Sequence, residues 1–186
     1  MALSDNVTAV DGRSPTTHLI THARQGSQAA WEMLVRQHQE HAFRLAYLIL
    51  GDAIEAEEVA QEAFIRAYLK LERFDAERPF RPWLLSIAAN LARNRRRSLG
   101  RYWAMAQRWW QQTEAARDTL PADEAQQLWQ AVQTLSTAAQ EVVYLRYFLE
   151  LSEAETAATL NIRPGTVKSR LHRALKQLRV ILESDE

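Results

Sequence analysis

The chain has 186 residues and contains no cysteine. Disulfide bonds and zinc sites with cysteine ligands are therefore excluded, and the composition fits a reducing compartment. The sequence also lacks the run of about 18 apolar residues that a membrane-spanning helix needs. Its N-terminus does not combine a basic stretch with an apolar one, as a secretion signal would. Together these absences predict a soluble, cytoplasmic protein.

Sequence motifs of enzymes are also missing. The chain has neither a glycine-rich phosphate-binding loop nor the turn that presents a nucleophilic serine. Two histidine pairs at helical spacing, His18 with His22 and His38 with His41, can in principle ligate a metal ion. A catalytic site would add a third ligand and a carboxylate in a defined pattern, which the sequence does not provide. We therefore expect no catalytic residue, no cofactor, no metal site and no enzymatic activity.

The formal net charge is zero, but the charges are segregated along the chain. Residues 52–62 include five acidic residues and no basic one, whereas residues 93–110 include six arginines and no acidic residue. Residues 161–180 again contain six lysines or arginines and no acidic residue. Such blocks indicate one surface for nucleic acid and another for a basic partner, so the zero sum does not argue against DNA binding.

Apolar residues recur at helical spacing over most of the chain, and no segment shows the two-residue alternation of a half-buried strand. Hydrophobic residues make up 47% of the sequence, which is enough to fill two small helical cores. We therefore predict an all-α fold with two small helical domains. The predicted division is a flexible tail at 1–15, a first domain at 16–97, a linker at 98–122 and a second domain at 123–186.

Capping signals divide the first domain into helices. Ser27 predicts the start of a long helix that Gly51 ends. Asp52 and Glu55 have the spacing of a capping box and predict the start of the next helix, whose outer face is acidic. Residues 74–82 contain two prolines, which break the helical pattern and predict a loop.

A further helix is predicted over residues 82–97, and its polar side chains form one stripe. Asn90, Arg93, Asn94 and Arg97 are spaced i, i+3, i+4 and i+7. Amides can pair with base edges, and guanidinium groups with phosphates or base faces, so the stripe is a candidate nucleic-acid surface. The predicted linker that follows contains tryptophans and a tyrosine among arginines, and these aromatic residues either pack on a domain or bind a partner.

The segment LSEAETAATLNIRPGTVKSRLHRA, residues 151–174, is typical of two helices joined by a tight turn. Ser152 with Glu155 predicts a capping box, and Asn161 can adopt the left-handed conformation that ends a helix. Pro164 suits the first turn of a second helix. This layout predicts a helix-turn-helix. In the helix that precedes the motif, Thr137 and Gln140 again have capping-box spacing.

The second helix of this motif separates apolar from polar residues. The residues predicted to face the core are Val167, Leu171, Ala174, Leu175, Leu178 and Leu182. Those predicted to point outward are Thr166, Ser169, Arg170, Arg173 and Lys176. The outward set suits a phosphate-lined groove in which arginine and serine also reach base edges. The alternative is an ordinary solvated basic helix face.

Two motifs in fixed order resemble the extracytoplasmic-function (ECF, group IV) sigma factors of bacterial RNA polymerase. DAIEAEEVAQEAFIRAYLKLERF, followed by FRPWLLSIAANLARNRRR, resembles the sigma-2 domain of the family. LRYFLELSEAETAATLNIRPGTVKSRLHRALKQLR resembles its sigma-4 domain. The resemblance covers residues from about 20 to 97 and 123 to 182, and the pair of motifs is far more specific than either one alone.

The resemblance implies an alternative sigma factor that binds core RNA polymerase, recognises the −35 and −10 promoter elements and promotes DNA melting. It implies docking of one acidic helix on the clamp helices of the polymerase β′ subunit, with contacts from Asp52, Glu55, Glu58, Gln61 and Glu62. It implies that the unpaired −10 strand, with one flipped base, is held by Phe80, Trp83, Asn90, Arg93, Asn94 and Arg97. It implies that the −35 element is bound by Arg146, Thr166, Lys168, Ser169, Arg170, His172, Arg173 and Lys176.

Within these sets, Trp83 is also a candidate core residue. The implied partners are core RNA polymerase, including its β subunit, promoter DNA and an anti-sigma factor, with no insertion into a membrane. The competing interpretation is a stand-alone helix-turn-helix regulator. Such a regulator would need its own dimerisation or sensor domain, and it would leave the acidic helix at 52–62 unexplained.

Overall fold

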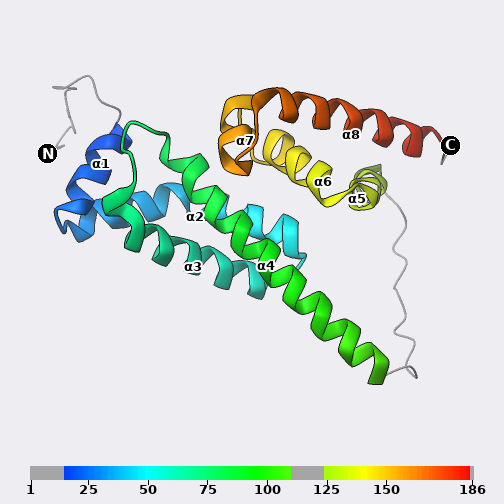
Figure 1. Ribbon diagram of the computed structural model, residues 1–186, viewed down its shortest axis with the longest axis horizontal. Helices are drawn as coiled ribbons and strands as arrows, with labels where there is room; N and C mark the ends of the chain where they lie inside the picture. Colours follow the sequence, from blue (N-terminus) through cyan, green and yellow to red (C-terminus); the bar gives the residue numbers. More distant parts are fainter. Residues whose placement is uncertain (1–14, 110–123, 185–186) are drawn as a thin grey trace, which may run out of the picture.

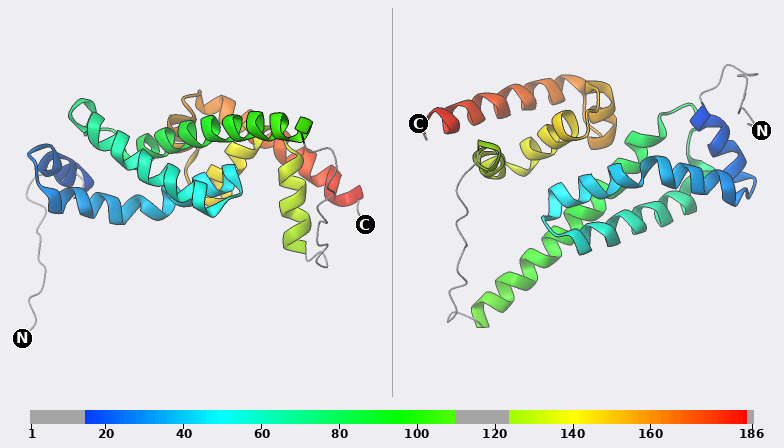
Figure 2. Two further views of the ribbon diagram at one scale, coloured as in Figure 1. Left: turned by 90° about the horizontal axis from the view of Figure 1, so that it is seen from below. Right: turned by 180° about the vertical axis from the view of Figure 1, so that it is seen from behind.

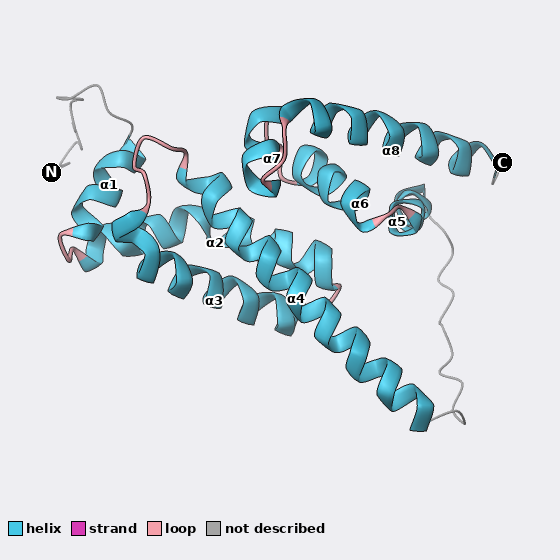
Figure 3. Ribbon diagram, viewed as in Figure 1, coloured by secondary structure: helices cyan, strands magenta, loops and turns pink. Residues whose placement is uncertain are grey.

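The computed structural model describes residues 15–109 and 124–184, and all the regular structure in these two ranges is helical (Figure 1). The prediction of an all-α fold is confirmed, and Figure 3 shows the helices joined by short loops. The elements are α1 (Pro15–Arg24), α2 (Gln28–Leu50), α3 (Ala53–Lys70), η1 (Leu71–Arg73), α4 (Phe80–Trp109), α5 (Glu124–Thr134), α6 (Thr137–Val143), η2 (Tyr144–Phe148), α7 (Glu153–Leu160) and α8 (Pro164–Ser184). Of the tail predicted at 1–15, residues 1–14 lie outside the described residues, and Pro15 begins α1.

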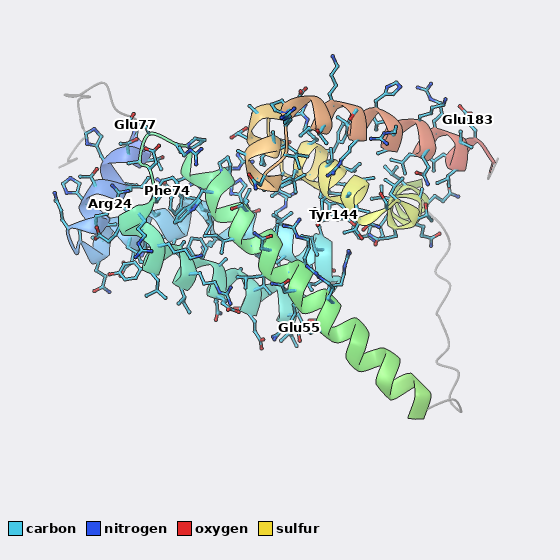
Figure 4. All side chains as sticks on the ribbon, in the orientation of Figure 1. Arg24, Glu55, Phe74, Glu77, Tyr144 and Glu183 are labelled. Atoms are coloured by element: carbon cyan, nitrogen blue, oxygen red, sulfur yellow. The ribbon has the colours of Figure 1, made fainter. Side chains whose placement is uncertain are left out.

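Helices α1 to α4 form an N-terminal bundle around α2. Ser27 caps α2 by accepting a hydrogen bond from the backbone of Ala30, and Gly51 ends it with a φ of 73°. Such a left-handed conformation favours glycine, which has no Cβ to clash. Alanines recur on the buried sides of α3 and α4, where small side chains let helices approach closely. Arg24 of α1 donates to the carbonyl groups of Leu71 and Phe74 and so anchors the loop before α4 (Figure 4).

Helix α4 is longer than the sequence predicted. It begins at Phe80 rather than Pro82 and continues to Trp109, into the segment 98–122 that was predicted to be a linker. Its C-terminal half extends past the end of α3 (Figure 1). The packing of the aromatic side chains in this half lies outside the described residues. The predicted domain boundaries stay predictions.

Helices α5 to α8 form a C-terminal bundle that contains the predicted helix-turn-helix. Ser152 and Glu155 at the start of α7 exchange both bonds of a capping box, at 3.2 and 2.8 Å. Asn161 ends α7 with a φ of 53°, and α8 begins at Pro164. These local predictions are confirmed. Leu175 was predicted to face the core but is 41% exposed, so this prediction is wrong.

Two other predicted capping boxes are wrong because tertiary contacts take their side chains. Asp52 does accept from the backbone of Glu55, at 2.9 Å, but the Glu55 carboxylate binds Arg95 of α4 instead of returning to Asp52. The second expected cap, at Thr137, is displaced to Ser136 without a side-chain bond. The Gln140 amide donates to two carbonyl groups of α5 instead.

The two bundles lie against each other and share one continuous hydrophobic core. Helix α7 packs on α4, and η2 contacts α2; the views in Figure 2 show the C-terminal helices beside the N-terminal half of α4. None of the described helices combines the length and the apolar character that crossing a membrane requires.

Candidate functional surfaces

The acidic face predicted on α3 is present and exposed. Asp52, Gln61 and Glu62 lie in solvent, as does Glu58, whose side chain is 58% exposed. Glu55 is more covered because it lies where α3 meets α4 (Figure 4). The face is also partly neutralised from within the protein.

Two arginines carry out this neutralisation. Arg95 of α4 binds both Glu55 and Glu58, and the hydrogen bond to Glu55 raises the pKa of the arginine. Arg66 pairs with Glu62 one turn along α3. The sequence placed Arg95 in a basic block suited to DNA, whereas the structure directs it to the carboxylates of the neighbouring helix.

Exposed apolar side chains lie among these carboxylates, and the sequence analysis missed them. Ile54 and Leu69 are each 74% exposed and Ile65 is 60% exposed, all on α3. Beside them a groove of about 520 Å³ runs between α2 and α3, with Phe43 and Phe64 in its lining. The missed signal was available, since these residues fall on the helix face opposite the core residues. Large apolar side chains that share a surface with charges are typical of a protein interface.

The polar stripe on α4 is exposed at three of its four predicted residues, whereas the fourth, Arg93, is partly buried. Asn90, Asn94 and Arg97 are exposed, and the two asparagine carbonyl groups accept from Arg93 and Arg97 respectively. This arrangement fixes the orientation of both amides and directs their NH₂ groups away from the arginines, where they can donate to an acceptor such as a base edge. Their role in DNA binding stays a prediction.

The aromatic residues predicted to hold the −10 strand lie in a cluster at the start of α4. Phe80 is 2% exposed, and its ring meets Phe74 edge-on at 5.8 Å. Trp83 stacks on Phe74 at 4.3 Å and remains partly exposed. Contact between Phe80 and a base would therefore require the ring to leave this cluster. Trp83 can reach a ligand from its present position.

One histidine of the pair on α2, His38, contacts the same cluster, and both histidines are half-buried. The His38 ring lies 5.3 Å from Phe80, and neither of its nitrogens has a hydrogen-bond partner among the described residues. Burial, together with the positive charges of His41 and Arg81, lowers the pKa of His38 to about 4. Burial also lowers the pKa of His41. In the described residues no group of three or more potential metal ligands occurs.

Helix α8 presents most of the predicted −35 residues on its outer side. Lys168, Ser169, His172, Arg173 and Lys176 are exposed, whereas Thr166 and Arg170 are partly buried. The guanidinium of Arg173 donates to the Ser169 carbonyl at 3.2 Å and therefore lies along the helix surface. Arg146 differs from the rest, because it donates to the carbonyl of Leu151 and supports the turn before α7.

A set of bonds that the sequence could not predict joins α4 to the C-terminal bundle. Arg93 pairs with Glu141 of α6 at 2.9 Å, and Arg96 donates to the Thr137 hydroxyl at 2.8 Å. Glu141 had no assigned role in the sequence, yet its side chain is only 7% exposed. Loss of solvation raises the pKa of this carboxyl group, although Arg93 acts in the opposite direction.

Comparisons with known proteins agree with this division into two bundles. The family Sigma-70 region 2 matches residues 34–102, and Sigma-70 region 4 matches residues 125–178. The ECF RNA polymerase sigma factor SigW of Bacillus subtilis (strain 168) is 36% identical over 175 residues, covering 86% of this chain and 92% of that protein. SigE of Mycolicibacterium smegmatis, also an ECF sigma factor, is 31% identical, covering 95% of this chain and 70% of that protein.

Solved structures give the same result for the fold. The structure of CnrH in complex with the cytosolic domain of CnrY matches with a TM-score of 0.69 and 26% identity, covering 92% of this chain and 99% of CnrH. The sigma factor RpoE of Bartonella quintana, solved with the anti-sigma factor NepR, matches with a TM-score of 0.65 and 22% identity, covering 83% of this chain and 98% of that one.

Proposed function

This chain belongs to the ECF RNA polymerase sigma factors of the sigma-70 family, and from that premise we propose which of its surfaces perform each step. It is an alternative sigma factor, which binds core RNA polymerase, recognises −35 and −10 promoter elements and promotes DNA melting. We assign polymerase docking to the outer face of α3, the −10 strand to the polar stripe of α4, and the −35 element to the outer side of α8. The protein acts in the cytoplasm, where the polymerase is.

The observation that carries this assignment is the placement of three surfaces, of two chemical kinds, on three separate helices. The α3 surface combines carboxylates with exposed apolar residues, whereas the α4 and α8 surfaces combine amides, hydroxyl groups and cations. Carboxylates repel phosphates, so α3 is the surface least suited to DNA and best suited to a protein with basic residues. Its apolar residues supply the desolvated contacts that give a protein interface its affinity.

The α4 stripe suits an unpaired strand rather than a duplex. Asn90 and Asn94 can pair with the edges of splayed bases, and Arg97 can meet a phosphate. Trp83, partly exposed at the N-terminal end of the same helix, offers a ring on which a base can stack. Stacking of this kind contributes about 1–3 kcal/mol per base and offsets the cost of unstacking the duplex.

The α8 surface suits the major groove, which accepts a helix and presents base edges to it. Ser169 and Arg173 lie one turn apart on the exposed side, with Lys168 and Lys176 flanking them. We assign base reading to the first two residues and phosphate contacts to the lysines. His172 lies on the same exposed side and adds a further polar group to it.

An anti-sigma factor is the remaining partner that we propose. Its support is the similarity to CnrH, whose solved structure includes the cytosolic domain of CnrY. The apolar groove between α2 and α3 can accept part of such a partner, and binding there would compete directly with the polymerase. The alternative of a stand-alone regulator has no comparable support, because it gives the region 2 match no role.

The docking assignment predicts that charge reversal on α3 weakens polymerase binding without unfolding the bundle. We expect Glu58→Lys with Glu62→Lys to lower the affinity for core polymerase by about tenfold, since exposed charges orient and steer association. Helix content should stay unchanged, because exposed ion pairs contribute little to stability. The matched control is Glu183→Lys, at an exposed site near the end of α8 (Figure 4).

The measurement is fluorescence anisotropy of the labelled chain titrated with core polymerase, together with circular dichroism. Transcription from a promoter library, with and without the chain, tests the function as a whole. Unchanged affinity of the double variant would refute the docking surface. No promoter-specific transcript from the parent chain would refute the function itself.

A further inference from the structure

The first helix of the protein bonds to the segment that leads into α4. The sigma-70 matches cover residues 34–102 and 125–178, so α1 lies outside both. Two of its side chains nevertheless donate hydrogen bonds to three backbone carbonyl groups between residues 71 and 76. Figure 4 shows Arg24 beside Phe74, where the loop before α4 begins. Helix α1 thus fixes a segment that lies within the region 2 match.

Arg24 holds two peptide groups of this segment at once. Its Nε donates to the carbonyl of Leu71 at 3.0 Å, and its Nη2 donates to the carbonyl of Phe74. These two carbonyl groups lie at the two ends of η1, so the planar guanidinium group fixes both ends relative to α1. Hydrogen bonds from a charged donor are about twice as strong as neutral ones, which leaves the backbone little freedom here.

A second side chain of α1 bonds further along the loop. The Thr17 hydroxyl donates to the carbonyl of Ala76 at 3.3 Å, and Thr17 is itself buried. Within the loop, the Asp75 carboxylate accepts from the backbone N–H of Glu77 at 3.1 Å. The Asp75 carbonyl accepts from the backbone N–H of Arg78 at 3.0 Å. The loop therefore has a defined conformation, which α1 sets from one side and Asp75 sets from within.

The aromatic ring at the start of this loop supports Trp83. The buried Phe74 ring stacks on the Trp83 ring, with 4.3 Å between their centroids and 30° between their planes. Phe74 thus covers part of the indole, while Trp83 remains partly exposed. A ring that is already held in place loses less conformational freedom when a base stacks on it, and its affinity for the base is higher for that reason.

We propose that Arg24 is a positioning residue for the −10 strand: it fixes Phe74, and Phe74 holds Trp83 in the orientation that accepts an unpaired base. Thr17 supports the same loop through the carbonyl of Ala76. This inference rests on the proposed contact between Trp83 and the −10 strand. It gives α1 a part in promoter melting that requires no contact between α1 and DNA.

The test uses the full chain assembled with core polymerase. The probe is a fluorescent single strand that spans the −10 element of a promoter identified by the library transcription assay. Fluorescence anisotropy over a salt series gives the affinity for the intact strand and for strands that lack one base at each position in turn. The base that stacks on Trp83 is the one whose removal weakens binding by the parent chain but not by Trp83→Ala.

We expect Arg24→Ala to weaken binding of the intact strand by about fivefold, which is part of what one stacked base contributes. The difference from the parent should disappear for the strand that lacks the base stacked on Trp83. The salt slope should stay unchanged, because no phosphate contact is lost. Thr17→Val, which keeps the shape of the side chain, should act in the same direction but less. Arg36→Ala, a charge-matched control at an exposed position of α2, should leave the affinity unchanged.

Circular dichroism and the affinity for core polymerase distinguish positioning from a general structural role. Both should stay at the parent values for Arg24→Ala, whereas a loss of core affinity in parallel with strand affinity would refute positioning. If Arg24→Ala itself loses helix content, Thr17→Val decides by the same measurements.

The remaining outcomes separate this inference from the proposed function. If Arg24→Ala binds the strand as the parent does, or loses the same factor whichever base is removed, Arg24 does not act through Trp83 and the inference is refuted. A salt slope reduced by about 0.7 would mean that Arg24 contacts a phosphate directly, which also refutes it. If Trp83→Ala leaves strand binding unchanged, the proposed −10 role of Trp83 is refuted, and the inference with it.

Discussion

Acidification should destabilise the protein through His38, and the effect can be isolated by one substitution. The ring is packed against Phe80 and faces two further positive groups, His41 and Arg81. Protonation would place a positive charge on a ring that burial has largely removed from water and that already faces two positive groups. Its pKa is therefore lowered to about 4. In the unfolded chain the ring would titrate near its ordinary pKa of about 6.5.

Between these two values the unfolded chain takes up a proton that the folded chain does not. Stability contributed by the neutral ring is therefore fully present above about pH 6.5 and is lost as the pH falls toward 4. From pH 7.5 to pH 5 the loss amounts to about 2 kcal/mol. The raised pKa of Glu141 acts in the opposite direction, because that group binds its proton more tightly when folded. Burial lowers the pKa of His41 as well, and that group acts in the same direction as His38. The total pH dependence thus combines several groups, and a comparison of variants isolates His38.

The comparison is between the parent chain and His38→Leu, unfolded by urea at half-unit steps from pH 7.5 to pH 5 and monitored by circular dichroism. Since neither ring nitrogen has a hydrogen-bond partner in the described residues, the variant should be at least as stable as the parent at pH 7.5. It should lose about 2 kcal/mol less on acidification. The control is His18→Leu, at an exposed position on α1 that leaves the cluster intact. Equal losses in the parent and His38→Leu would refute the reasoning.

Two further predictions concern the C-terminal bundle. Ser152→Ala should lower the free energy of unfolding by about 1 kcal/mol, measured in urea, because it removes the cap of α7 and leaves the Glu155 backbone NH without its partner. Arg173→Ala should cost about 1–3 kcal/mol on the preferred −35 duplex and flatten discrimination at one base position, whereas Lys176→Ala should weaken all sequences equally and reduce the salt slope by about one. Binding to single-base −35 variants over a salt series decides between them, and a uniform loss for Arg173→Ala would mean that it serves only as a phosphate contact.

The helix boundaries that could be predicted from sequence are those set by neighbouring residues. Ser27, Gly51, Asn161 and the capping box at Ser152 all act within one turn of chain, so their residue types are sufficient evidence. The box expected at Asp52 failed because Arg95, forty residues away, is a stronger partner for Glu55 than a backbone NH is. The local sequence pattern could not show that Arg95 would bind the Glu55 carboxylate.

In the candidate sites too, features set by neighbouring residues could be predicted and features set by distant partners could not. The stripe on α4 could be predicted because its spacing alone places the asparagines and arginines on one side. The burial of Phe80 and of His38 could not, since both depend on how α2 and α4 cross. Nor could the role of Glu141, which looks in sequence like any other acidic residue of the second domain and gains its partner only when the two bundles meet.

The arginine run on α4 shows why a charge block does not define a single surface. Successive residues of a helix point about 100° apart, so neighbouring arginines must face different surroundings. Arg95 turns to the carboxylates of α3, Arg93 and Arg96 turn to α6, and Arg97 stays exposed beside Asn94. In this arrangement the asparagines and Arg97 are exposed, while the other three arginines are held by carboxylates and a hydroxyl group. The number of arginines in residues 93–97 therefore overstates the positive charge that α4 presents to a DNA strand, because three of the four are bonded to other helices of the protein.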